Sequence, residues 1–230
     1  MIDIVVATCE RLPLLMRTIE SIRERTRTPY RLHVIDDAST EGNGRYLKTL
    51  QDEGVVDRLV LRSRREGISA NLRALHGMTT GKLMVYCDDD QLAPNVEPDW
   101  LARLMMEISQ RPRMAMLSLN NPHGNVGGDK RHRLGVDGAV TLCERSGGSY
   151  MCIRRSLLPQ IAPGDKEKSP VSAMCMRARE LGWENGYLTE TYCWHIGAIS
   201  VRNGWDLTRA IEQLTPVDMD TLEPREEFRG

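Results

Sequence analysis

The sequence is poor in aromatic residues and almost neutral in charge. Phe occurs once among 230 residues, aromatic residues make up 5%, and the formal net charge is -1 at pH 7. A chain so balanced has no overall field that would attract nucleic acid or a membrane surface. The hydrophobic share of 40% is ordinary for a soluble globular domain, so methionine and aliphatic side chains must fill its core.

The sequence also lacks long apolar runs and paired cysteines. No run approaches the ~20 residues of a membrane span, and residues 1–6 have the pattern of a strand and not of a signal segment. We therefore expect no stable membrane association. The six cysteines include no Cys-x-x-Cys pair, which argues against a zinc knuckle. We expect reduced thiols and a cytoplasmic protein.

What the sequence does contain is an alternation of strand and helix patterns. This alternation predicts an α/β fold with a mostly parallel sheet flanked by helices. In the first half we expect strands and helices in turn at 2–7, 12–25, 31–35, 45–51, 56–61, 67–77 and 82–87. In the second half we expect a helix from Pro98, a strand at 114–119, an irregular loop or lid at 120–138, strands at 140–143 and 149–154, and a helix at 170–181 with Ser169 as its N-cap.

Three consecutive carboxylates, Asp88, Asp89 and Asp90, end the apolar run at 83–87. Their mutual repulsion at the end of a buried strand costs stability unless a cation offsets it. Mg²⁺ takes one or two protein carboxylates and completes its shell with phosphate oxygens. Because open α/β sheets bind ligands at the carboxyl ends of their strands, this cluster predicts a metal–diphosphate site. The alternative is an acidic turn after a strand.

Several motifs occur in an order that resembles the family 2 glycosyltransferases with the GT-A fold, over roughly residues 2 to 200. These motifs are Ile4-Val5-Val6-Ala7-Thr8-Cys9-Glu10-Arg11, Val34-Ile35-Asp36-Asp37-Ala38-Ser39, Arg65 with Gly67 and Asn71, Tyr86-Cys87-Asp88-Asp89-Asp90, Gly147-Gly148, Met174 to Trp183, and His195-Ile196-Gly197. The resemblance implies an enzyme that uses a nucleotide-diphosphate sugar, most simply a UDP-sugar, with Mn²⁺ or Mg²⁺. It implies a GT-A sheet with a smaller mixed region on the acceptor side.

The resemblance also implies roles for individual residues. Asp88 and Asp90 fit the Asp-x-Asp metal pattern, whereas the distance to Pro94 favours Asp89. We expect Asp90, Asp88 and His195 at the metal. We expect the nucleotide sugar to contact Thr8, Glu10, Asp36, Asp37, Arg65, Asn71, Asp88, Asp89 and Gly148. Relatives more often carry Asn at the Glu10 position, Arg64 competes with Arg65, and Asn71 is equally suited to tying its helix to the sheet.

The catalytic base is where this sequence departs from the family. Relatives carry an Asp, often in a Glu-Asp pair, just before the helix at 170–181, where this chain has Pro170 and Val171. The nearest carboxylates are Asp165 and Glu167, of which we favour Asp165. Asp137 and Glu144 are alternatives, and a chain that binds donor but transfers poorly is another.

Two other function classes compete with an inverting glycosyltransferase. A nucleotidyltransferase should have a Gly-rich phosphate loop after its first strand, and residues 8–11 contain no glycine. A nucleotide-sugar-binding protein with degraded catalysis would explain Val171. We expect residues 1–95 to bind the nucleotide sugar, 96–205 to form the acceptor and catalytic half of the same domain, and 206–230 to form a C-terminal helix and loose tail. The soluble acceptor is not specified: a metabolite, a protein, a glycan or a modified nucleic-acid base.

Overall fold

The computed structural model describes residues 1–121, 132–165 and 167–197. The first half builds four parallel strands in the order β3-β2-β1-β4. Their bounds are Ile2–Thr8 for β1, Tyr30–Asp36 for β2, Arg58–Leu61 for β3 and Leu83–Asp88 for β4. The connecting helices are α1 (Leu12–Arg25), α2 (Glu41–Asp52) and α3 (Gly67–Met78).

The second half extends this sheet to nine strands by mixed pairing, β4-β9-β6-β10-β8-β7. Strand β9 is antiparallel to both neighbours, β10 is parallel to β6, and β8 and β7 form an antiparallel hairpin. The bounds are β6 Met114–Asn120, β7 Arg133–Asp137, β8 Val140–Cys143, β9 Met151–Arg154 and β10 Glu184–Tyr192. A separate pair joins β5 (Gln91–Leu92) to β11 (Trp194–His195). The helices are α4 (Trp100–Gln110), η1 (Arg155–Leu157), α5 (Leu158–Ile161) and α6 (Pro170–Glu180).

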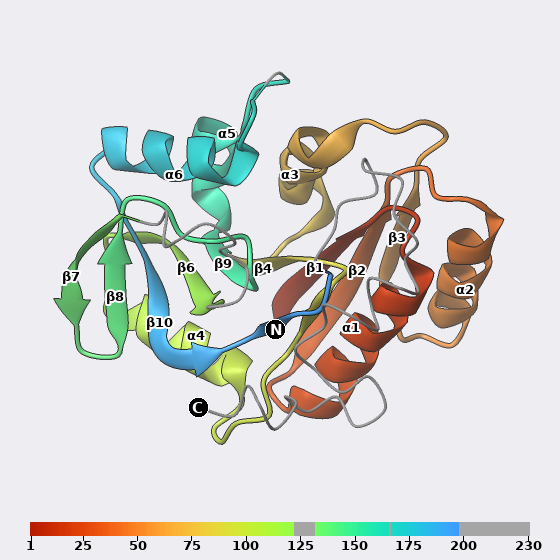
Figure 1. Ribbon diagram of the computed structural model, residues 1–230, viewed down its shortest axis with the longest axis horizontal. Coiled ribbons are helices and arrows are strands. Elements are labelled where there is room, and N and C mark those ends of the chain that lie inside the picture. The colour runs from red at the N-terminus through yellow and green to blue at the C-terminus, as the bar shows by residue number, and fades with distance from the viewer. Residues whose placement is uncertain (122–131, 166, 198–230) are drawn as a thin grey trace.

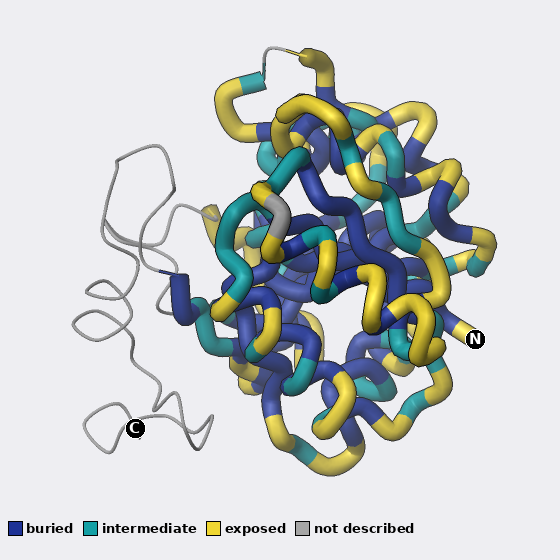
Figure 2. Tube along the Cα trace, turned by 90° about the vertical axis from the view of Figure 1, so that its right-hand side faces the viewer, coloured by how far each residue is buried: buried dark blue, intermediate teal, exposed yellow. Residues whose placement is uncertain are grey.

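Helices cover both faces of the sheet because the central strands are apolar on both sides. In β1, Ile4 and Val6 pack with α1, α2 and α4, whereas Val5 and Ala7 pack with α3, α5 and α6. Figure 1 shows these two helical layers on either side of the sheet. In Figure 2 the buried strands run through the middle of the molecule and the exposed positions lie on the turns around them.

The predicted α/β architecture is confirmed, and several details differ from the expectations. Helix α2 begins at Glu41 and not near residue 45. Strand β7 lies within the expected loop at 120–138, of which residues 122–131 lie outside the described residues. All five residues of β7 are exposed. The sequence therefore lacks the alternation of buried apolar and exposed polar residues that predicts a strand. Ser169 precedes α6 but makes no side-chain cap; its hydroxyl donates to that of Ser172 at 2.8 Å.

Strand β10 was not expected because a glycine interrupts its sequence pattern. A Cβ atom on Gly186 would lie 2.7 Å from Val140 Cγ1 and 3.0 Å from the carbonyl of Thr141. Glycine therefore permits the close approach of β8 to β10. No helix in the described ranges is long and apolar enough to cross a membrane. All six cysteines are free thiols, five of them buried.

Candidate functional site

The parallel register brings three polar strand ends together at one edge of the sheet. Thr8, the last residue of β1, pairs with Asp36 at the end of β2, and Ala7 pairs with Asp88 at the end of β4. Side chains that lie 28 and more positions apart in the sequence thus share one rim. This is the edge at which open α/β sheets bind ligands.

The acidic cluster at this edge is largely buried and is held by hydrogen bonds. The side chains of Asp89 and Asp90 are 0% and 4% exposed, and Asp88 is half-buried. Thr8 Oγ1 donates to Asp89 Oδ2 at 2.5 Å, and Tyr86 donates to Asp88 Oδ1 at 2.8 Å. The guanidinium of Arg11 forms ion pairs with both Asp89 and Asp90. Two of the three carboxylates therefore share one arginine, and the third accepts from Tyr86.

A second chain segment, β11, adds a histidine to the cluster. His195 Nε2 lies 3.1 Å from Asp90 Oδ2, and the amide of Ile196 donates to the Asp90 carbonyl at 2.8 Å. A Cβ atom on Gly197 would lie 2.3 Å from Asp90 Oδ2, so glycine is required where this segment crosses the cluster. The structure thus brings together Asp90 and His195, which are 105 positions apart in the sequence.

Burial and pairing push the acidic pKa values in opposite directions. Burial raises the pKa of Asp89 to about 7 and that of Asp88 to about 6, with repulsion from Asp90 adding to the effect. Burial also works to raise the pKa of Asp90, but His195 and Arg11 outweigh it and hold that pKa below its usual range. Asp90 in turn raises the pKa of His195. Asp90 is therefore the carboxylate most firmly ionised at neutral pH.

The donor set fits a hard divalent cation that takes its remaining ligands from elsewhere. Asp90 Oδ1 is buried and has no hydrogen-bond partner, so one charged oxygen remains unmatched. His195 supplies an imidazole on the other oxygen of the same carboxylate. Within the described residues, no group of three His, Cys, Asp or Glu side chains is arranged to hold a metal alone. Two protein donors leave positions for phosphate oxygens and water.

At the end of β2, Asp36 and Asp37 have different surroundings. Asp36 Oδ2 accepts from the Ser39 amide at 3.0 Å, while its Oδ1 is buried without a partner. Asp37 accepts from the amides of Glu66 and Gly67 at 2.9 and 2.7 Å. Asp37 therefore fastens the β3–α3 loop to this edge, and Asp36 keeps one oxygen unmatched.

Glu10 and Arg65 bridge two loops beside this edge. Glu10 has a positive φ of 65° and accepts from Arg65 at 2.9 Å and from the Thr40 amide at 3.1 Å. Arg64 is 84% exposed and pairs with Glu66 at 3.7 Å. Arg65 pairs with Glu10, and Arg62, at 3.5 Å from Asp37 Oδ1, is a second arginine at this rim. Asn71 is buried in α3, and its Oδ1 has no hydrogen-bond partner.

Comparison with known proteins places most of this chain in a family. The family model described as glycosyl transferase family 2 matches residues 3–181. The chain belongs to that family. Its structure resembles the mannosyltransferase PcManGT from Pyrobaculum calidifontis, solved with GDP-Man and Mn²⁺, at a TM-score of 0.70 and 18% identity over 88% of this chain and 59% of that one. It also resembles GalNAc-T7, solved with UDP, GalNAc and Mn²⁺, at a TM-score of 0.68 and 17% identity over 91% of this chain and 47% of that one.

A third similar structure is residues 1–349 of S. aureus TarS, at a TM-score of 0.62 and 14% identity over 96% of this chain and 67% of that one. The comparison with curated proteins gave no match. The chain spans about three fifths of the mannosyltransferase and about half of GalNAc-T7. At these identities the solved structures establish the GT-A fold, which confirms the fold expected from the motifs.

In this member of the family, each carboxylate considered as a base lies in an ion pair with a basic side chain. Asp165 pairs with Arg73 at 2.6 Å, and its side chain is 83% exposed. Glu167 pairs with Arg177 at 2.6 Å. The alternatives Asp137 and Glu144 pair with Arg111 at 2.8 Å and with His132 at 3.8 Å. None of these four carboxylates pairs with the acidic cluster in the part of the chain that the structure describes.

The start of α6 lies beside the cluster, but without a carboxylate. A Cβ atom on Gly148 would be 3.6 Å from Val171 Cγ2 and 3.8 Å from Asp88 Oδ2. Val171 is in the first turn of α6, which contains no acidic residue. The position at which the motif resemblance leads us to expect the base is thus apolar and, like Asp88, lies next to Gly148.

Sequence reasoning assigned no role to Arg11, although Arg11 contacts two of the three aspartates. The available signal was electrostatic, because adjacent buried carboxylates need a counter-cation and Arg11 follows the neighbouring strand. The need for glycine at 197 has no local sequence signal, since it arises only from the crossing of Asp90.

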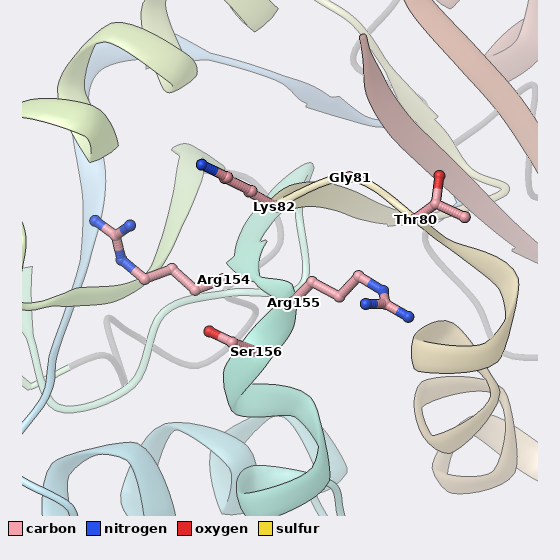
Figure 3. Close-up of a pocket in the computed structure, with 6 residues that line it drawn as sticks. All are labelled: Thr80, Gly81, Lys82, Arg154, Arg155 and Ser156. Atoms are coloured by element: carbon pink, nitrogen blue, oxygen red, sulfur yellow. The ribbon is translucent and has the colours of Figure 1, made fainter.

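A cavity of about 400 Å³ lies at the opposite end of the strands from the acidic cluster, where β4 begins and β9 ends. It is lined by Thr80, Gly81, Lys82, Arg154, Arg155 and Ser156. Figure 3 shows Lys82 and Arg154 directed to one side and Arg155 to the other. Arg154 already donates to the carbonyls of Met114 and Ile108, at 2.7 and 2.9 Å. Because these cations do not converge, the edge with the acidic cluster is the stronger candidate site.

Proposed function

We propose that this chain transfers a sugar from a nucleotide-diphosphate donor, most simply a UDP-sugar, to an acceptor hydroxyl with Mn²⁺ or Mg²⁺. The observation that carries the proposal is the buried cluster at the joined ends of β1, β2 and β4, with an unmatched oxygen on Asp90 and an imidazole beside it. Nucleotide and Mn²⁺ are named for two of the similar structures, which supports the same ligand class here.

The donor roles follow from which atoms remain free. The unmatched Oδ1 of Asp36 would accept from a base N–H or a ribose hydroxyl, and Arg65 with Glu10 would border the nucleoside. Thr8, Asp37 and Asn71 would shape the pocket. The diphosphate and sugar would lie along Asp88, Asp89 and Gly148, and the cation would be held by Asp90 and His195, with Asp88 between it and the diphosphate.

In an inverting transfer, the acceptor oxygen bonds to the anomeric carbon while the bond from that carbon to the diphosphate breaks. The acceptor proton passes to a carboxylate, for which Asp165 is our first choice and Glu167 our second. Either side chain must leave its arginine to do so. When bound, the divalent cation offsets the charge that develops on the leaving diphosphate.

We assign residues 1–95 to donor binding and 96–205 to the acceptor side, in a cytoplasmic protein; residues 198–230, and with them the tail expected at 206–230, lie outside the described residues. The acceptor is a soluble metabolite, a protein, a glycan or a modified nucleic-acid base.

Thermal unfolding with UDP, GDP, CDP and dTDP, each with and without Mn²⁺, tests the donor site. A ligand at ~100 times its dissociation constant stabilises the fold by ~2.7 kcal/mol. We expect one nucleotide to raise Tm only with metal, in the wild type and in the control Asp52→Ala on the exposed end of α2, but not in Asp90→Ala. If no nucleotide shifts the wild type, the donor site is refuted.

Val171 favours a second candidate, a protein that binds the donor without transferring its sugar. Its apolar side chain lies beside Asp88 where the family's base would be. An assay of released nucleoside diphosphate over a panel of acceptors separates the two. Release that Asp165→Asn abolishes and Asp57→Asn preserves supports transfer, whereas tight nucleotide binding with no release supports the binding protein. The match to family 2 counts against the nucleotidyltransferase alternative.

A further inference from the structure

Arg11 occupies the acidic cluster as a cation of the protein's own. Its two terminal nitrogens face different residues, Nη1 toward Asp90 Oδ2 and Nη2 toward Asp89 Oδ1. The Arg11 side chain is only 16% exposed, and the two carboxylates are buried. A guanidinium that bridges two carboxylates is among the strongest charge-assisted contacts available to a protein.

This contact satisfies a requirement of the metal-free fold. Two adjacent buried carboxylates are unstable without a counter-charge. Among the described residues, Arg11 and His195 are the cationic side chains that pair with Asp88, Asp89 or Asp90. Of these three aspartates His195 pairs with Asp90, so within the described residues Arg11 is the cationic partner of Asp89, whose other oxygen accepts from Thr8.

A divalent cation on the same carboxylates would meet this guanidinium at close range. Like charges a few ångströms apart in a partly buried site repel strongly. We propose that Arg11 is the resident counter-cation of the metal-free site, and that a divalent cation together with the donor diphosphate drives its guanidinium off Asp89 and Asp90. The inference rests on the proposed function, because it names what the donor and metal displace.

The local backbone permits this exchange. Arg11 is the residue before α1 and supports the helix through its carbonyl, which accepts from the Leu15 amide at 2.9 Å. Its side chain makes no cap, so the guanidinium can leave without breaking a helix hydrogen bond. The released guanidinium would then be free to take phosphate oxygens in a bidentate geometry.

The exchange predicts opposite effects of one substitution on two ligands. Without Arg11, Mn²⁺ alone meets no competing cation and should bind more tightly. The nucleotide bound with Mn²⁺ loses the Arg11 guanidinium as a partner for its phosphates. Mn²⁺ should therefore increase the affinity for the nucleotide less in this variant than in the wild type. A residue that merely supported the fold would weaken both.

Calorimetric titration of Mn²⁺ into the nucleotide-free protein decides the matter. We expect Arg11→Gln to bind Mn²⁺ roughly tenfold more tightly than the wild type, since one repelling charge is gone. The control Arg17→Gln should match the wild type, because Arg17 is in the helix that follows Arg11 and, among the described residues, pairs with Glu20 at 3.4 Å and not with the acidic cluster. Equal or weaker binding by Arg11→Gln, or no Mn²⁺ binding by either protein, overturns the proposal.

A second pair of variants covers the case in which Arg11→Gln does not fold. Asp89→Asn removes one carboxylate, and Asp89→Asn with Arg11→Gln removes a carboxylate and the guanidinium together, which keeps the net charge of the cluster unchanged. We expect the double variant to bind Mn²⁺ more tightly than the single one; equal affinities overturn the proposal. If the wild type binds Mn²⁺ but no nucleotide diphosphate, the proposed function fails while this comparison still judges Arg11.

Discussion

Asp3 offers the sharpest test of how the scaffold supports the site. Its buried carboxylate ties β1 to β2 and to the turn before β4. Oδ1 accepts from Arg31 and His33 at 2.7 and 3.0 Å, and Oδ2 accepts from the amides of Thr80 and Gly81 at 2.8 and 2.9 Å. The three strands that carry the candidate site are thus joined at their opposite ends by one side chain.

The change Asp3→Asn removes the charge and one acceptor oxygen. If the amide oxygen faces the two backbone N–H groups, the contact to Arg31 is lost. A hydrogen bond to a charged group contributes about 1.5–3 kcal/mol, and Arg31, at 33% exposure, recovers some hydration. We therefore expect a loss of about 2–3 kcal/mol in the free energy of unfolding at pH 7, measured by urea denaturation.

The loss should depend on pH in a defined direction. Burial disfavours the charged form of Asp3, but His33, Gly81 and Thr80 outweigh it and hold its pKa below the usual range. A lowered folded-state pKa gives stability that is complete above about pH 3.9 and is lost as the pH falls through the folded-state value. The deficit of Asp3→Asn should thus shrink in strongly acidic solution.

Asp52→Asn, at the exposed end of α2, serves as the control and should change stability by less than about 0.5 kcal/mol. If Asp3→Asn is no less stable than this control at pH 7, or its deficit persists undiminished below both pKa values, the reasoning is refuted. Nucleotide binding by the folded variant should be unchanged, because Asp3 is at the other end of the strands.

Three further predictions concern the acidic cluster and α4. Because the pKa of Asp89 is raised to about 7, the metal-free protein should lose stability as the pH rises from about 4 through 7, and Asp89→Asn should flatten that urea-denaturation profile. Gly197→Ala places a Cβ atom 2.3 Å from Asp90 Oδ2, so we expect it to lower stability by about 1–3 kcal/mol and to weaken Mn²⁺ binding in calorimetry, whereas Gly77→Ala, with open space around it, should do neither. Asp99 caps α4 by accepting from the Leu101 and Ala102 amides, each at 3.0 Å. Asp99→Ala should therefore lower the free energy of unfolding by about 2 kcal/mol, as measured by thermal unfolding, whereas an alanine substitution at an exposed site that caps no helix should not lower it.

Much of the donor half could be predicted from sequence because its signals are local. The buried strand Ile2–Thr8 has an apolar run from Ile4 to Ala7, and the polar residues that follow such runs fall at one edge once the strands are parallel. The acidic run at Asp88 was recognisable for the same reason. Its arginine was not, since the contact between Arg11 and Asp90 depends on the register of β1 against β4.

The second half was harder to predict from the sequence because its strands pair with strands that are distant in the sequence. Strand β7 is exposed along its length, and β10 contains a glycine whose reason lies across the sheet in Val140. Mixed pairing also removes the regular strand–helix alternation on which the first half depended. Both strands belong to residues 96–205, which we propose as the acceptor side.

The division of the molecule bears on how catalysis is to be sought. The proposed donor site lies at one edge, where buried aspartates, Arg11 and His195 are held by strands and by ion pairs with one another. The carboxylate that would accept a proton has no counterpart there, because Val171 lies next to Gly148 on the side of the cluster and the nearest upstream acids are paired with arginines. If transfer occurs, a paired carboxylate such as Asp165 must therefore be released from its arginine when the acceptor binds. Acceptor binding and base placement would then be one event, and the activity of Arg73→Gln, which frees Asp165 in advance, would depend less on the acceptor than that of the wild type.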